Sequence, residues 1–184
     1  METHEAIRTW RSTRKFSDRP VEKEKVAVIL ESVRRSPSWA NMQCWKLIVV
    51  TDEDTRRSLS DLTFVESVFG SLGYTCNPAQ KGVAQAPVVI VLCADPARSG
   101  SIWNQDFYLT DAGIAAQNLM LATHDQGLGT VFIGIFDEEA VRSLLLIPPD
   151  QRVVGLFPVG YPLSTRETTQ RKELAEIVCY EKWS

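Results

Sequence analysis

Apolar residues recur at helical spacing along much of the chain. Val26, Ile29 and Val33 stand three to four positions apart and predict a helix over residues 21–35. The longest helix candidate, residues 104–126, is apolar on nearly all sides, so we expect it to be central and buried. Shorter helices are predicted over three further segments: residues 2–10, 52–62 and 137–146.

Apolar runs of strand length lie between these helices. They cover residues 45–51, 87–94, 131–135 and 153–159. The run at 87–94 is apolar almost without a break, which is typical of a strand in a sheet covered on both faces. Because helices and strands alternate, the pattern predicts an α/β or α+β domain with one central sheet and helices around it.

Two segments do not follow this pattern. Residues 63–85 mix aromatic side chains with glycine and proline, and we interpret them as a flap over a pocket. The tail, residues 163–184, is polar at first and then carries apolar residues such as Ile177 and Trp183. Such a tail needs a surface to lie on, and a partner subunit would supply one.

The composition is that of an ordinary globular domain. The 184 residues are 44% hydrophobic and 23% charged, which suits a single domain over residues 1–184. A net charge of −3 gives no footprint for nucleic acid. No apolar run approaches the roughly 18 residues of a membrane span. The first ten residues lack the apolar core of a signal peptide, so we expect a cytoplasmic protein.

The charge is unevenly distributed along the chain. Residues 1–35 hold nine Lys and Arg against six Asp and Glu, although the whole chain is acidic. This asymmetry has two interpretations: cations placed for one small anion, or a solvated helix face.

The cysteines and histidines exclude several kinds of chemistry. The four cysteines form no C-x-x-C pair, and His4 and His124 have no metal-ligand spacing, so no metal site is predicted. We expect His124 to be an exposed or capping residue and Cys93 to be a small buried hydrophobe. If the chain is an enzyme, its chemistry therefore comes from a bound cofactor.

Two segments carry candidate binding groups. Residues 11–14 place two guanidinium groups and two hydroxyl groups together, which suits a phosphate or a carbonyl edge, although basic tetrapeptides are often only solvated. Residues 36–45 form a polar loop before a buried strand, a usual place for ligand contacts, or else a plain connecting turn. The glycines at 127–134 do not form a dinucleotide fingerprint, because Phe132 stands where a glycine is required.

Taken in order, these segments resemble the FMN-dependent nitroreductase family, and the resemblance covers nearly the whole chain. The matching motifs are R-S-T-R-K-F at 11–16, S-P-S-W-A-N-M-Q-C-W at 36–45, A-P-V-V-I-V at 86–91, G-L-G-T at 127–130, V-G-Y-P at 159–162, and Arg171-Lys172. The resemblance implies an α+β nitroreductase-like fold with a central, mainly antiparallel sheet surrounded by helices. It also implies an obligate homodimer in which the C-terminal tails embrace the partner and two FMN sites lie at the interface.

The same resemblance assigns residues to the flavin. Those contacting its phosphate, ribityl chain and pyrimidine edge would be Arg11, Ser12 and Arg14. Those approaching from the other subunit would be Pro37, Ser38 and Asn41, with Gln43 as a further candidate in that loop. Backbone at Ile133, Gly134 and Ile135 would lie beside the hydride-accepting nitrogen. Arg171 and Lys172 would close on the phosphate.

The implied reaction is the reduction of small electron-poor acceptors, such as nitroaromatics or quinones, by NADH or NADPH in a ping-pong sequence. No catalytic side chain is implied, because the chemistry occurs on the flavin, and a cation such as Arg14 would stabilise the negative charge that develops there.

Two departures from the family pattern bear on this assignment. Trp10 stands in place of a second arginine, and Cys44 stands in place of the proline in N-x-Q-P-W. Two alternatives to the oxidoreductase therefore stay open. One is a flavin-binding module with little turnover, and the other is a partner-binding domain that holds no flavin.

Overall fold

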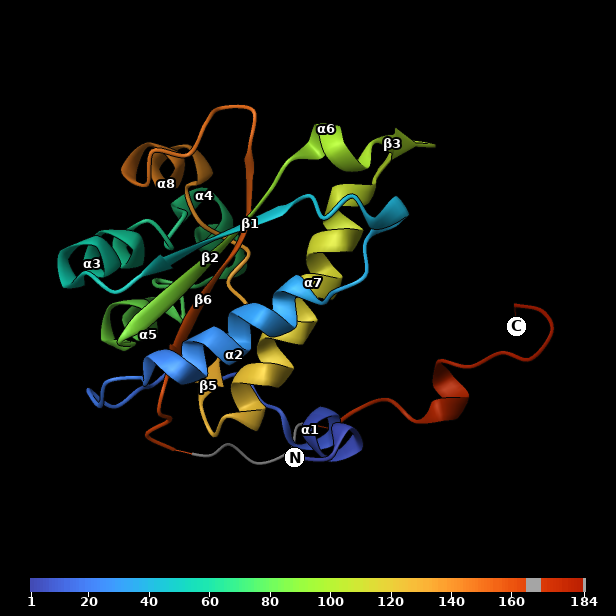
Figure 1. The fold of residues 1–184 in the computed structure, drawn as a ribbon, viewed down its shortest axis with the longest axis horizontal. Helices are drawn as coiled ribbons and strands as arrows, with labels where there is room; N and C mark the ends of the chain where they lie inside the picture. Colours follow the sequence, from blue (N-terminus) through green and yellow to red (C-terminus); the bar gives the residue numbers. More distant parts are fainter. Residues whose placement is uncertain (165–169, 184) are drawn as a thin grey trace.

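The fold is built on a four-stranded antiparallel sheet in the order β1-β2-β6-β5 (Figure 1). The computed structural model describes residues 1–164 and 170–183. The strands are β1 (Trp45–Val50), β2 (Val88–Ala94), β5 (Gly129–Thr130) and β6 (Arg152–Gly160). An antiparallel sheet flanked by helices is the α+β architecture that the sequence predicted.

The central strand β2 is the most deeply buried element of the sheet. All seven of its residues are buried, because β1 and β6 flank it and helices cover both of its faces. Its valines and isoleucines favour the extended backbone and pack well on a pleated surface. Cys93 is buried among them, as predicted for a small hydrophobe.

Two long helices, α2 (Lys23–Arg34) and α7 (Phe107–Asp125), lie side by side across one face of the sheet (Figure 1). Leu119 of α7 and Ile29 of α2 are fully buried in the core on that face. The predicted helix is thus confirmed and one side of it is buried, but Leu109 and Ile114 are exposed, so it is not buried on nearly all sides as predicted. It begins three residues later than predicted because residues 101–106 form a short hairpin.

The opposite face of the sheet is covered by three shorter helices: α3 (Glu53–Asp61), α5 (Gln80–Gln85) and α8 (Glu138–Leu144). Leu59, Val83 and Val141 place one fully buried side chain from each helix against β2 and β6. The remaining elements are short: α1 (Thr3–Thr9), η1 (Trp39–Asn41), α4 (Glu66–Phe69), η2 (Gly70–Leu72), α6 (Pro96–Ser99), β3 (Ser101–Ile102), β4 (Gln105–Asp106) and η3 (Leu174–Glu176).

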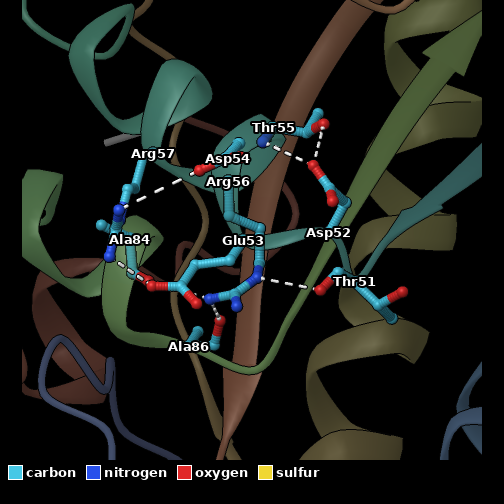
Figure 2. A network of polar contacts seen from close by, with 9 residues as sticks. All are labelled: Thr51, Asp52, Glu53, Asp54, Thr55, Arg56, Arg57, Ala84 and Ala86. Carbon is cyan, nitrogen blue, oxygen red and sulfur yellow. Dashed lines mark hydrogen bonds and ion pairs between the residues drawn. The ribbon is translucent and has the colours of Figure 1, made fainter.

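A polar network fixes α3 to the end of α5 (Figure 2). Asp52 caps α3 by accepting the backbone N–H and the hydroxyl of Thr55, at 2.9 and 2.7 Å, and these bonds lower the pKa of its carboxyl group. Arg56 donates to the carbonyl groups of Ala84 and Ala86 at 2.9 and 2.5 Å. The network therefore anchors the C-terminal end of the 63–85 segment.

The strand predicted at residues 131–135 is wrong in its extent. Only Gly129 and Thr130 pair continuously with β6, and one isolated bridge joins Ile133 to Leu156. The same register places Val131 opposite Pro158, which has no N–H for the ladder. The backbone at 131–135 is thereby released from continuous pairing.

The C-terminal tail lies away from the sheet (Figure 1). Residues 170–183 are all exposed, including Leu174, Ile177, Tyr180 and Trp183, the last at 97%. Part of the predicted tail, residues 165–169 and 184, falls outside the described residues. Among the residues that the structure describes, no helix is long and apolar enough to cross a membrane.

Candidate functional site

The segment at residues 11–14 lies against the short edge strand β5. Ser12 forms a parallel bridge with Thr130, and the Thr13 N–H donates to the Thr130 carbonyl at 2.9 Å. Gly129 permits this approach, because a Cβ atom there would lie 2.4 Å from Thr13 Oγ1. The missing side chain at 129 therefore lets the sheet edge fix the backbone of the basic segment.

A cavity of about 180 Å³ opens beside this segment. Its wall contains residues 9–15, His124, Leu128, Gly129, Pro162 and Ser164. Three predicted site residues, Arg11, Ser12 and Arg14, thus share one cavity. Two guanidinium groups with several hydroxyl groups form a donor set that suits an anion.

A second cavity, of about 200 Å³, lies beside the backbone that Pro158 releases from pairing. It is lined by Arg14, Phe69, Asn77, Pro78, Ala79 and residues 131–135. The predicted Ile133, Gly134 and Ile135 are therefore brought to the same place as Arg14. Arg14 therefore lines both cavities.

The 63–85 segment forms one wall of this second cavity. Phe69 is buried and stacks on Phe64, with ring centroids 5.7 Å apart. Asn77 is also buried; its side chain donates to the Thr63 carbonyl at 2.9 Å and accepts the Ala79 N–H at 2.9 Å. The segment is thus a folded wall with its own hydrogen bonds, and its role as a flap stays a prediction.

The remaining predicted residues lie elsewhere in the chain. The loop with Pro37, Ser38, Asn41 and Gln43 is at the opposite end of α7 from the basic segment (Figure 1). Asp111 contacts this loop and His124 contacts α1, and the 13 intervening helical steps span about 20 Å. A single chain therefore does not bring the two sets together. Arg171 and Lys172 are exposed in the tail.

Sequence reasoning missed the side chains that α7 contributes at its two ends. His124 was expected to be exposed or capping, but it is half-buried in the wall of the first cavity, and its Nε2 lies 2.8 Å from Thr9 Oγ1. Burial is the main cause that lowers its pKa. Asp111 is buried beneath the polar loop. A lone polar residue on an apolar helix gave no spacing signal for either.

Two buried N–H groups beside the first cavity have no hydrogen-bond partner within the described ranges. They are the indole N–H of Trp10 and the Nε–H of Arg11. The Arg11 Nη1 donates to the carbonyl groups of Arg8, at 2.9 Å, and Trp10. Unsatisfied buried donors are costly, so their presence in residues of a cavity wall favours an acceptor-rich ligand there. The residues present therefore fit an anionic, phosphate-bearing group.

Comparison with known proteins identifies relatives along nearly the whole chain. Residues 7–161 match the model of the nitroreductase family. The oxygen-insensitive NADPH nitroreductase of Salmonella typhimurium is 30% identical, with 93% of this chain and 70% of that protein aligned. The FMN reductase [NAD(P)H] of Bacillus subtilis is also 30% identical, with 83% and 62% aligned.

Solved structures agree with these relatives. A nitroreductase family protein from Clostridium novyi NT superposes with a TM-score of 0.81 at 30% identity, covering 91% of this chain and 89% of that one. The NADPH:FMN oxidoreductase of Vibrio harveyi, in complex with NAD⁺, superposes with a TM-score of 0.82 at 26% identity, covering 99% and 78%.

The substitution Gly129→Ala tests the support of the basic segment. The added methyl group would collide with Thr13 and displace its neighbours, so we expect a loss of about 1–3 kcal/mol in stability and weaker binding of FMN, the cofactor that the resemblance implies. Urea unfolding and FMN titration measure the two effects. In the control Gly70→Ala, the new methyl meets only an ordinary contact at 3.9 Å. Equal FMN affinity in both variants would contradict the role of Gly129.

Proposed function

The chain belongs to the nitroreductase family and is an NAD(P)H-dependent flavin oxidoreductase, and we propose that it holds FMN in the two cavities that meet at Arg14. The observation that carries this proposal is the position of Arg14. It lines the first cavity together with the donors Arg11 and Ser12, and it lines the second cavity together with the backbone at 131–135. The proposed acceptors are small electron-poor molecules such as nitroaromatics or quinones.

We assign each part of the flavin to a different group of residues. Arg11 and Ser12 would hold the phosphate and ribityl chain in the first cavity, where buried donors lack partners. Arg14 would face the pyrimidine edge, and the backbone at 133–135 would lie along the ring in the second cavity. Arg171 and Lys172 would add cations to the phosphate from the tail.

FMN, when bound, would supply the hydride chemistry, accepting a hydride from NAD(P)H and passing it to the acceptor. The task of Arg14 is then electrostatic: a fixed cation lowers the energy of negative charge that develops on a group beside it. The second cavity, walled by residues 131–135 and the 63–85 segment, would admit NAD(P)H and the acceptor in turn. That alternation gives the proposed ping-pong kinetics without a protein acid or base.

We propose a homodimer in which each flavin site uses residues of both subunits. The loop with Pro37, Ser38, Asn41 and Gln43 lies about 20 Å along α7 from the basic segment, so it would serve the site of the partner. The exposed apolar side chains of residues 170–183 support a tail that embraces the partner. The domain is then one unit, residues 1–184, with 63–85 as its flap and 163–184 as its dimer-embracing tail.

The first experiment is the visible absorption spectrum of the freshly purified protein, followed by heat release and mass measurement of the cofactor. We expect a yellow protein that releases about one FMN per chain and oxidises NAD(P)H when menadione or a nitroaromatic is added. Parallel double-reciprocal plots would support the ping-pong sequence. A protein that binds FMN but oxidises no NAD(P)H would be the flavin-binding module instead.

The substitution Arg14→Ala tests the residue on which the proposal rests. Loss of one charge-assisted hydrogen bond costs about 1.5–3 kcal/mol, so we expect FMN to bind roughly 10- to 100-fold more weakly or to be reduced more slowly by NAD(P)H. Stopped-flow reduction and FMN titration measure these effects. The control Arg57→Ala removes an exposed arginine on α3. Unchanged FMN affinity and reduction rate in Arg14→Ala would exclude the role given to Arg14.

A chain that ends at Pro162 tests the tail. Removal of residues 163–184 takes away the apolar side chains that need a partner surface, so we expect monomers that hold no flavin. Sedimentation and the visible spectrum report the two properties. A stable, flavin-loaded dimer of the shortened chain would refute the embracing tail.

A further inference from the structure

The loop at residues 36–44 has an unusual backbone. Ala40, Asn41 and Gln43 have φ angles of 45°, 56° and 49°, in the left-handed region that non-glycine residues seldom adopt. Each such residue is disfavoured relative to an ordinary conformation, and a run of them persists only where the surroundings hold it. Something outside the loop must therefore maintain this shape.

Hydrogen bonds within the loop are part of the support. The Gln43 N–H donates to Ser38 Oγ at 2.9 Å, and the Gln43 side-chain amide donates to the Asn41 side-chain oxygen at 3.2 Å. These bonds pair the polar groups proposed to meet the flavin with one another. They do not connect the loop to the core.

Asn118 of α7 donates to Ser36 Oγ at 2.8 Å at the start of the loop, and Asp111, in the first turns of α7, connects its centre and its end to the core. Asp111 is only 2% exposed, and its Oδ1 accepts the Trp39 N–H at 2.8 Å. Its Oδ2 accepts the hydroxyl of Ser99 at 2.7 Å, while Cys44 Sγ lies 3.8 Å away as a weak donor. One buried carboxylate thus receives donors from the start of η1, from the end of the loop and from α6.

The contact of Asp111 with the end of the loop depends on the thiol of Cys44. The residue stands where the resembling family has proline, which offers no donor to a carboxylate. Its thiol is 3% exposed, and burial, as the main cause, raises its pKa, so the group stays protonated and able to donate to Asp111. The thiol thereby adds a contact from the end of the loop to α7.

We propose that Asp111 is a positioning residue for flavin binding, which holds the 36–44 loop in its left-handed conformation so that Asn41 and Gln43 are set in place before FMN arrives. The inference rests on the proposed function for its ligand. Asp111 does not itself touch the flavin in this proposal. A loop that is already ordered avoids the entropy cost of being ordered on binding, and the affinity is higher for that reason.

The first test compares full-length Asp111→Asn and Ser99→Ala with the natural chain. Ser99 is outside the proposed flavin contacts, so its loss acts on FMN only indirectly, through its contacts with Asp111 and Cys44. We expect about tenfold or more weaker FMN binding in Asp111→Asn, and several-fold weaker binding in Ser99→Ala, by titration. The matched control is Glu138→Gln, a carboxylate on α8 that also accepts a backbone N–H, from Val153 at 2.9 Å.

The second test needs no FMN. Cys44 and Cys93 are both 3% exposed, so the labelling of each by N-ethylmaleimide reports the opening of its own surroundings once rates measured across a range of pH have been corrected for the thiol pKa, which Asp111 raises at Cys44. We expect Cys44 to be labelled about tenfold faster in Asp111→Asn, and faster in Ser99→Ala, while Cys93 stays protected in β2. Peptide mass mapping distinguishes the two thiols.

The outcomes separate this inference from the proposed function. If Asp111→Asn does not fold, Ser99→Ala decides. Natural FMN affinity and natural Cys44 protection in the folded variants would overturn the inference and leave the flavin function intact. If Asp111→Asn increased the labelling rates of Cys44 and Cys93 equally, the inference would also be overturned, because Asp111 would then stabilise the whole fold and not the loop in particular. A natural chain that takes up no FMN would overturn the proposed function, while the labelling still tests the loop.

Discussion

The packing of α7 on α2 and on the sheet is the constraint on which the rest of the structure depends. The polar side chains on its buried side have little access to water and must be paired within the protein. Asp111 is paired with the loop at one end, and His124 with Thr9 of α1 at the other. The hydrogen bonds of these two side chains therefore connect α7 to the 36–44 loop and to the helix that precedes the basic segment.

The basic segment itself is held by a close approach of two backbones. Gly129 and the bridge to Thr130 fix residues 11–14 against the sheet edge, and Pro158 ends the continuous ladder where the second cavity begins. Neither device uses a charged group. The segment is thus anchored through its backbone, and its two arginines line the first cavity, which suits a site that must bind an anion and stabilise negative charge.

Much of this was predictable from the sequence, and the failures have identifiable physical causes. The unbroken apolar run of β2 was predicted because burial on both faces leaves a clear pattern, whereas α7, predicted to be buried on nearly all sides, is exposed at Leu109 and Ile114. The strand at 131–135 failed because the proline that interrupts it, Pro158, is on the partner strand, and register cannot be deduced from one strand alone. Asp111 was missed because its partners, at 39, 44 and 99, are far away in sequence.

The exchange of proline for Cys44 also changes when the loop can form. A proline restricts its own φ angle in the unfolded chain as well as in the folded one, so its restraint does not depend on the rest of the fold. The thiol and the Asp111 carboxylate meet only after α7 has packed on the sheet. In this chain the left-handed loop is therefore held partly by tertiary contacts, and its contribution to a flavin site is coupled to the packing of α7.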